Sequence, residues 1–405
     1  MTSKNLIQID KIRIKNSNSV LQKNLSKKFD KIFLNIKSDI TKKNKTLNVL
    51  DKNFKFNFKI NDLNKFKKFK TITFVGMGGS ILGAEAIYNF FKTKVKKKVY
   101  FLNDIDEDKI TNLKASKNLP KTLFVVISKS GNTTETLSNI FALNILKKRS
   151  KNIIIISEKK DNLLFSISKK LGIFYVEHKD YIGGRYSVLS EVGMLPAHLM
   201  GININKLRSD IRDCIKGKNK ILLKNSTIQL ANIISKKKFY SLILLNYSPE
   251  LEKFLYWCQQ LIAESLGKKN KGILPVVSNA PKDHHSLLQL YLDGPDDKFF
   301  NIFSYDKKSK EKVEINKSLS INSFLNKKKL SSIKSAQRKA LIKSFLKKNI
   351  SFREFKIKRA DENVLGKLFS LFMIETIIVG KLLNINPFDQ PAVEQVKVNT
   401  KQILI

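Results

Sequence analysis

A carboxylate and an amide lie four residues apart in a stretch that is otherwise mostly apolar. The run is Gln260-Leu261-Ile262-Ala263-Glu264, and residues four apart lie on one face of a helix. A carboxylate in such a setting either forms a structural pair or acts as a base with a raised pKa. The spacing alone favours the structural pair, so any catalytic use of Glu264 depends on what surrounds it.

A glycine-rich loop joins a predicted strand to a predicted helix. Gly76-Met77-Gly78-Gly79-Ser80 follows the apolar run 71–75 and precedes residues 81–91, which have helical spacing. Backbone N–H groups at the start of a helix favour anions. The glycine spacing differs from the G-x-G-x-x-G of dinucleotide sites, and a tight turn without a ligand is the alternative interpretation.

A second loop of the same kind is rich in hydroxyl groups. It runs from Ser128 through Lys129, Ser130 and Thr133 to Thr136, after the predicted strand 123–127. One or two of these hydroxyls could cap the next helix. The number of hydroxyls beside a glycine exceeds what capping requires, so the loop is better explained as a cradle for a phosphate group.

An arginine and two histidines are further candidates for chemistry. Arg185 follows Gly183 and Gly184, which allow a ligand to approach the backbone closely. Its guanidinium offers planar donors to an oxyanion, although a plain surface arginine is possible. His284 and His285 suit proton transfer near neutral pH. No cysteine or third histidine at ligand spacing completes a metal site, so no metal is predicted.

The C-terminal segment begins with a turn. Residues 386–397 read as a turn into a helix that Asp389 can cap, with Lys397 inside that helix. The chain has 77 Lys and Arg residues, so chemistry alone gives no reason to single out Lys397. His178 and His198 do not lie in a motif with other candidate functional residues, and both are predicted to be structural.

The elements that position these residues alternate between strand and helix. A parallel sheet flanked by helices is the expected result, and the alternation occurs twice, so the predicted fold class is α/β with two tandem domains. We expect four parts, which are an N-terminal helical extension, two sheet domains and a C-terminal helical segment, at residues 1–65, 66–210, 211–385 and 386–405. The length of 405 residues is sufficient for two hydrophobic cores.

The composition favours a soluble protein with anionic ligands. The formal net charge is +43 at pH 7, but lysine is spread along the chain without a basic helix or an RNA-binding motif. We therefore expect attraction of anionic substrates rather than specific nucleic-acid binding. Two cysteines, Cys214 and Cys258, make no disulfide framework. A cytoplasmic location without a membrane partner is predicted, and the apolar run 368–383 reads as a buried helix.

Taken together, these segments resemble the glucose-6-phosphate isomerase family. The motifs that carry the resemblance occur in the family's order and extend from Gly76 to Lys397. The most specific are Ser128-Lys129-Ser130, Gly183-Gly184-Arg185-Tyr186-Ser187-Val188, Gln260-x-x-x-Glu264-Ser265-x-Gly267-Lys268, His285-Ser286-Leu287-Leu288-Gln289-Leu290 and Phe388-Asp389-Gln390-x-x-Val393-Glu394-x-x-Lys397. The resemblance implies two sugar-isomerase (SIS-type) domains with the site between them.

The resemblance also implies a role for each candidate residue. Glu264 would move the proton between C2 and C1 of a hexose 6-phosphate through a cis-enediol(ate), and Arg185 would stabilise the charge that develops. His285 and Lys397 would act on ring opening. The sugar phosphate would be bound by Gly79, Ser80, Ser128, Lys129, Ser130, Thr133, Gly184 and Gln260.

The implied protein works in glycolysis and gluconeogenesis, needs no cofactor and forms a homodimer in which His285 enters the neighbouring subunit's site. Three other readings stay open. A sugar-phosphate sensor would need only the phosphate loop, and a broader isomerase would also accept mannose 6-phosphate. A nucleic-acid-binding protein would use the positive surface.

Overall fold

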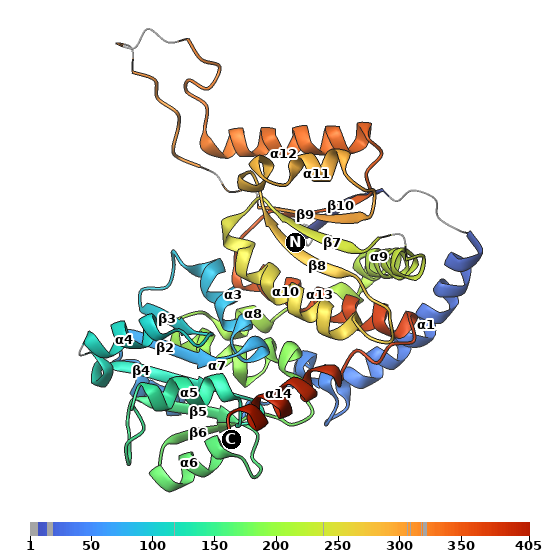
Figure 1. Cartoon of the computed structure of the whole chain (residues 1–405). Helices are drawn as coiled ribbons and strands as arrows, with labels where there is room; N and C mark the ends of the chain where they lie inside the picture. Colours follow the sequence, from blue (N-terminus) through green and yellow to red (C-terminus); the bar gives the residue numbers. More distant parts are fainter. Residues whose placement is uncertain are drawn as a thin grey trace.

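The computed structural model contains two five-stranded sheets, each flanked by helices (Figure 1). It describes residues 7–13, 19–116, 118–237, 239–305, 307, 309–316, 318 and 322–405. The chain builds the first sheet in its first half and most of the second sheet in its second half. The predicted fold class, tandem α/β with mainly parallel sheets, is therefore confirmed.

The first sheet is parallel throughout, in the order β3-β2-β4-β5-β6. Its central strands β4 and β5 are buried along their whole length, as expected for a parallel sheet covered on both faces. The strands are β2 (Thr71–Gly76), β3 (Lys98–Leu102), β4 (Thr122–Ile127), β5 (Ile153–Ser157) and β6 (Phe174–Glu177). The helices between them are α3 (Leu82–Phe91), α4 (Glu107–Ala115), α5 (Thr134–Ala142) and α6 (Leu163–Leu171).

The second sheet has the order β1-β10-β9-β7-β8, and only β1 runs antiparallel to its neighbour. Its strands are β1 (Ile7–Arg13), β7 (Ser241–Asn246), β8 (Leu274–Asn279), β9 (Lys298–Tyr305) and β10 (Phe352–Ile357). The helices are α9 (Gly217–Ser235), α10 (Glu252–Leu266), α11 (Leu288–Asp293), α12 (Leu330–Lys347) and α13 (Glu362–Leu382). The remaining helices are α1 (Ser19–Thr41), α2 (Ile60–Leu63), α7 (Glu191–Leu199), α8 (Ile204–Arg208) and α14 (Ala392–Ile403).

The N-terminal segment, expected as a helical extension over residues 1–65, also contains a strand. Helices α1 and α2 are present, but β1 precedes them and adds an edge strand to the second sheet through β10. Residues 7–13 alternate apolar and polar side chains at first, Ile-Gln-Ile-Asp, which is the period of a strand. Strand β3 was also not predicted, because its lysine-flanked run of apolar residues is short.

Helix α13 is confirmed as a buried core helix. Among the described residues it is one helix whose length and apolarity would suffice to cross a membrane, and 89% of that window is buried inside the protein. It is longer than the predicted run because it begins at Glu362. It packs against α9, α10, α1 and α8, and its Phe369 and Phe372 contact Phe254 of α10 edge to face.

The connection order places a switch point in the first sheet. The chain leaves β2 towards β3 on one side and then crosses to β4 on the other side. Ligands of open α/β sheets bind at the carboxyl ends of the two strands where this reversal occurs. The two anion-binding loops predicted from the sequence follow β2 and β4, so both lie at this point.

Candidate active site

The centre of the site is Arg185, which is 3% exposed. It lies in a short 3-10 helix, η5 (Gly184–Leu189), which precedes α7. Its Nη1 donates to Glu264 Oε2 at 3.0 Å and to Gln390 Oε1 at 2.7 Å. The guanidinium therefore joins α10, where Glu264 lies, to the segment that leads into α14.

Further hydrogen bonds fix the orientation of the guanidinium. Its Nε donates to Ser265 Oγ at 2.9 Å, and its Nη2 donates to the carbonyls of Pro387 and Asp389 at 2.7 and 2.9 Å. The Tyr186 hydroxyl lies 2.8 Å from Ser265 Oγ and donates to the Pro387 carbonyl at 2.9 Å. Because every nitrogen of the side chain donates, the guanidinium is held rigidly as a positive charge.

Glu264 is held from both sides. Gln260 Nε2 donates to Glu264 Oε1 at 2.7 Å, one helical turn earlier on α10, while Arg185 binds Oε2. The Glu264 side chain keeps 33% of its surface exposed, so the carboxylate is ordered but accessible. Gln260 Oε1 is buried and has no partner among the described residues. An acceptor without a donor beside an exposed carboxylate is suited to a ligand hydroxyl.

The glycine loop contacts the arginine loop directly. A Cβ on Gly79 would lie 2.3 Å from the carbonyl carbon of Gly184, and a Cβ on Gly78 would lie 2.9 Å from Gln260 Nε2. Gly78 also has a φ of +50°, which favours glycine. The loop after β2 forms the 3-10 helix η3 (Gly78–Ser80). Ser80 is therefore placed at the same edge as Gly184 and Arg185.

The hydroxyl-rich loop lies beside the glycine loop, because β4 pairs with β2 up to Gly76 and Ile127. Ser128 Oγ and Thr133 Oγ1 are 2.7 Å apart, and Ser130 Oγ is 3.5 Å from Thr133 Oγ1. Thr133 occupies the N-cap position of α5, but its side chain makes no capping bond. Its hydroxyl therefore belongs to the cluster rather than to the cap.

The Lys129 side chain points away from this cluster. Its Nζ donates to the Asp180 carbonyl at 2.8 Å and lies 3.4 Å from Glu158 Oε1. Gly131 has a φ of +68°, and a Cβ there would collide with Asn162 Oδ1. The side-chain amine of Lys129 is thus engaged by Asp180 and Glu158, and its backbone N–H is the group that Lys129 offers to an anion.

Two of the predicted site residues are not brought to Glu264 by any contact within the described part of the chain. His285 is exposed in the 3-10 helix η8 (Lys282–His285). His284 lies beside it, with Nε2 2.7 Å from the Tyr247 hydroxyl, and burial lowers its pKa, with a contribution from His285. Lys397 is exposed on α14 and pairs with Glu394 at 2.7 Å.

The prediction that Asp389 caps the last helix was wrong. Helix α14 begins at Ala392 with Pro391 at the N-cap and no side-chain cap. Asp389 Oδ1 instead pairs with Lys268 Nζ at 2.6 Å, and this hydrogen bond lowers the pKa of Asp389. The pair ties the end of α10 to the turn whose carbonyls bind Arg185.

Four residues of the site were not among the predicted site residues: Tyr186, Ser265, Lys268 and Gln390. Each lies within a motif already quoted, next to or near a predicted residue. The signal was therefore present in the sequence. Their function is to hold Arg185 and the turn in place, and such a role is visible only from the contacts.

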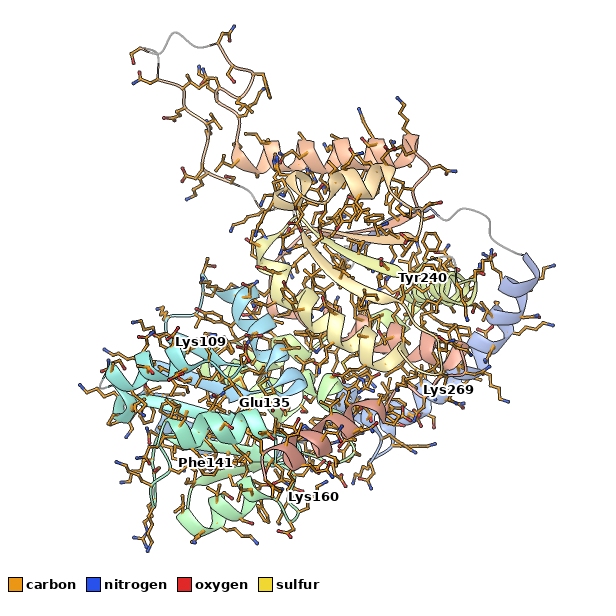
Figure 2. All side chains as sticks on the ribbon, viewed as in Figure 1. Lys109, Glu135, Phe141, Lys160, Tyr240 and Lys269 are labelled. Carbon is orange, nitrogen blue, oxygen red and sulfur yellow. The ribbon has the colours of Figure 1, made fainter. Side chains whose placement is uncertain are left out.

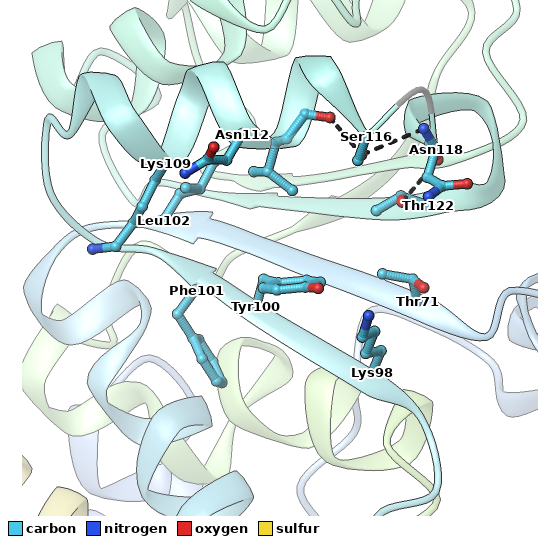
Figure 3. Close-up of a pocket in the computed structure, with 11 residues that line it drawn as sticks. Thr71, Lys98, Tyr100, Phe101, Leu102, Lys109, Asn112, Ser116, Asn118 and Thr122 are labelled. Carbon is cyan, nitrogen blue, oxygen red and sulfur yellow. Dashed lines mark hydrogen bonds between the residues drawn. The ribbon is translucent and has the colours of Figure 1, made fainter.

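A cavity of about 370 Å³ between strands of the first sheet and α4 is separate from this site (Figure 3). Thr71, Lys98 and Thr122 line it at the amino ends of β2, β3 and β4, together with residues of α4. The lining contains no residue of the glycine loop after β2 or of the hydroxyl-rich loop after β4. The cavity therefore makes no part of the site around Glu264.

The fold and the site together define a two-sheet α/β protein. Its first switch point has a glycine loop and a hydroxyl-rich loop, and a carboxylate nearby is fixed against a buried guanidinium. Residues 1–405 match the family model described as phosphoglucose isomerase. The chain therefore belongs to the phosphoglucose isomerase family.

Individual relatives are consistent with this assignment. A probable glucose-6-phosphate isomerase of Methanococcus maripaludis is 33% identical over 86% of this chain and 81% of its own length. A glucose-6-phosphate isomerase of Campylobacter jejuni is 31% identical over 89% of this chain and 90% of its own length.

Among solved structures, a hypothetical protein of Thermus thermophilus has a TM-score of 0.81 at 22% identity, covering 95% of this chain and 97% of its own. A glucose-6-phosphate isomerase from Chlamydia trachomatis has a TM-score of 0.71 at 20% identity, covering 85% and 72%. At these identities the solved structures support the fold alone.

Proposed function

We propose that this protein interconverts glucose 6-phosphate and fructose 6-phosphate, as the names of its relatives say of them. The observation that carries the proposal is the contact of Arg185 Nη1 with Glu264 Oε2 at 3.0 Å, in a site that also contains the hydroxyl cluster of Ser128, Ser130 and Thr133. A proton next to a carbonyl is weakly acidic, so its removal needs a base with a cation placed where negative charge develops.

In this proposal the phosphate group occupies the switch point of the first sheet. Hydroxyls supply donors, and the helix that starts at Thr134 points its positive end at the anion. Close packing of Gly79 on Gly184 brings the phosphate loops next to the sugar-binding residues. The residues assigned to binding are Gly79, Ser80, Ser128, Ser130, Thr133, Gly184 and the backbone of Lys129.

Glu264 is the proposed base. It takes the proton from C2 of the open-chain aldose and returns it to C1, so the two products of the transfer are the ketose and the regenerated carboxylate. Between these steps the cis-enediol(ate) carries negative charge on oxygen, which Arg185 stabilises. Gln260 orients the carboxylate and offers its unpartnered Oε1 to a sugar hydroxyl.

His285 and Lys397 are proposed to act on ring opening. Both side chains are exposed within one chain, which fits a homodimer in which His285 enters the site of the second subunit. We propose that Lys397 reaches the ring oxygen or O1 once substrate is bound. His284 is a poorer candidate, because its Nε2 already contacts Tyr247.

The remaining proposals concern the setting of the enzyme. We propose a cytoplasmic enzyme of glycolysis and gluconeogenesis that uses no cofactor, with domain boundaries near residues 65, 210 and 385. The exposed residues Lys109, Lys160 and Lys269 lie on separate parts of the molecule (Figure 2). This spread of charge suits attraction of anionic sugars better than specific binding of a nucleic acid.

The test is conversion of fructose 6-phosphate in deuterated water. Deuterium at C2 of the glucose 6-phosphate product is expected, because the base exchanges its proton with solvent between transfers. Glu264→Gln should reduce kcat by about 10²–10⁴-fold, the usual contribution of a positioned base. Glu107→Gln, on exposed α4, is the matched control and should retain activity.

Three outcomes would contradict parts of the proposal. Folded protein that binds the sugar phosphate without converting it would identify a sensor. Equal rates with mannose 6-phosphate and glucose 6-phosphate would identify a broader isomerase. Isomerisation that survives in Glu264→Gln would remove Glu264 from the mechanism.

A further inference from the structure

The second sheet has a switch point of its own. Strand β7 lies between β9 and β8, and the chain leaves β7 towards β8 before it crosses to β9. The carboxyl ends of β7 and β9 are therefore the position at which an open α/β sheet binds ligands. None of the residues proposed above for substrate binding lies there.

A large open cavity of about 1080 Å³ occupies this point. Residues that follow β7 line one side, Tyr247 to Glu250, and Ser304 and Tyr305 at the end of β9 line another. The first turns of α12 complete it, and this helix has no acidic residue in its first turn and no side-chain cap. The positive end of an 18-residue helix therefore lies at the wall of the cavity.

One buried hydroxyl in the wall has no partner. Ser304 is 5% exposed, and its Oγ makes no hydrogen bond with any residue that the structure describes. Its neighbour across the sheet, Ser248, is engaged, because Ser248 Oγ accepts from the Tyr305 N–H at 2.7 Å. A buried hydroxyl without a hydrogen-bond partner destabilises the folded state. A ligand that accepts a hydrogen bond from Ser304 Oγ would remove this cost.

The charge of the lining is strongly positive. Six cationic side chains line the cavity against two carboxylates; they are Lys307, Lys310, Lys329, Lys334, Arg338 and Lys339, with Glu250 and Glu311. Glu250 is already used, because it pairs with Lys307 at 2.8 Å. Arg338 pairs with Glu354 of β10. The four other lysines make no ion pair with a residue in the described ranges, so their charge is available to a ligand.

We propose that this cavity is a second anion-binding site, which takes a small molecule that carries two or more phosphate groups. The charge exceeds what one phosphate would neutralise, and the cavity volume is slightly above the ~300–1,000 Å³ of most small-molecule sites. The site is distinct from the first. Glu250 in its wall and Glu264 are fourteen residues apart along η7 (Pro249–Leu251) and α10, which corresponds to about 20 Å at ~1.5 Å per residue.

The experiment is calorimetric titration of the full-length protein with inorganic pyrophosphate at fixed ionic strength. Lys334→Glu reverses one charge of the lining and should weaken binding at least tenfold. Ser304→Ala removes the unpartnered hydroxyl, so it should weaken binding without lowering the melting temperature of the free protein. Circular dichroism checks that both variants fold.

Two controls test whether the cavity itself binds the pyrophosphate. Lys343→Glu makes the same charge change on an exposed position of α12 outside the cavity, and it should bind like the unaltered protein. Ser128→Ala alters the phosphate loop of the first switch point, so it should reduce any pyrophosphate binding at that loop and retain the binding that Lys334→Glu weakens. If Lys343→Glu weakens pyrophosphate binding as much as Lys334→Glu does, or if neither cavity variant weakens it, the second site does not exist.

Discussion

The contact between Gly79 and Gly184 gives a sharp prediction about activity. A methyl group at residue 79 would lie 2.3 Å from the Gly184 carbonyl carbon, 2.5 Å from its oxygen and 2.6 Å from the Arg185 nitrogen. All three atoms belong to the backbone, so no side chain can rotate away. Gly79→Ala must therefore push η3 and η5 apart.

The size of the displacement follows from ordinary contact distances. Carbon atoms in contact lie about 3.5 Å apart or more, so the two loops must separate by about 1 Å. Arg185 follows Gly184 directly, and a misplacement of this size can reduce the rate about 10²-fold. The strain itself should cost roughly 1–3 kcal/mol of stability.

The assay compares kcat for fructose 6-phosphate with the urea midpoint of the same preparation. Gly183→Ala is the matched control, because a methyl group there meets only the Tyr186 ring at 3.5 Å. It should stay close to the unaltered protein in both measurements. Gly79→Ala with an unchanged kcat and a normal midpoint would refute the claim that this contact positions Arg185.

Three further predictions follow from other contacts. Arg185→Lys keeps the charge but loses the planar donors that reach Glu264, Gln390 and two carbonyls, so kcat should fall at least about 10²-fold; a smaller loss would mean that charge alone suffices. Arg353→Met removes the arginine that forms a bidentate ion pair with buried Glu375. The free energy of unfolding measured in urea should fall by about 3–5 kcal/mol. Burial lowers the pKa of His178 to about 4 from 6.5, so the folded state resists protonation. The free energy of unfolding is therefore highest above pH 6.5. It falls by about 3 kcal/mol towards pH 4, because His178 is protonated in the unfolded state but not in the folded state. A His178→Asn variant should show a correspondingly shallower loss, and an equal loss would disprove the assignment.

The parts of the fold and site that could be predicted are those that depend on a pattern of residues close together in the sequence. The loops after β2 and β4 were found because a short apolar strand, glycines or hydroxyls, and a helical pattern follow one another along the chain. The same holds for Gln260 and Glu264, whose spacing predicts a shared face. Helix boundaries were less accurate, because one helix is predicted over residues 133–148, whereas α5 ends at Ala142.

The parts that were not predictable depend on contacts between distant residues. Nothing near Arg185 in sequence indicates that its guanidinium binds carbonyls about 200 residues later, at Pro387 and Asp389. Asp389 has the residue type of a helix cap, yet Lys268 captures its carboxylate. Strand β1 was not predicted, because its pairing partner, β10, lies near the other end of the chain.

The two switch points explain why one site needs both sheets. Strand β2 leads through its loop into α3, and β7 leads through its loop into α10; these two helices pack against each other. The packing places Gln260 of α10 against Gly78 of the first loop. In the proposed mechanism the first sheet thus provides the loops that bind the phosphate group. The second sheet provides the proposed base, Glu264, from the helix that follows its own switch strand. Since η7 lines the basic cavity and leads directly into α10, which carries Glu264 near its far end, a ligand bound in that cavity would lie beside the segment that precedes this helix.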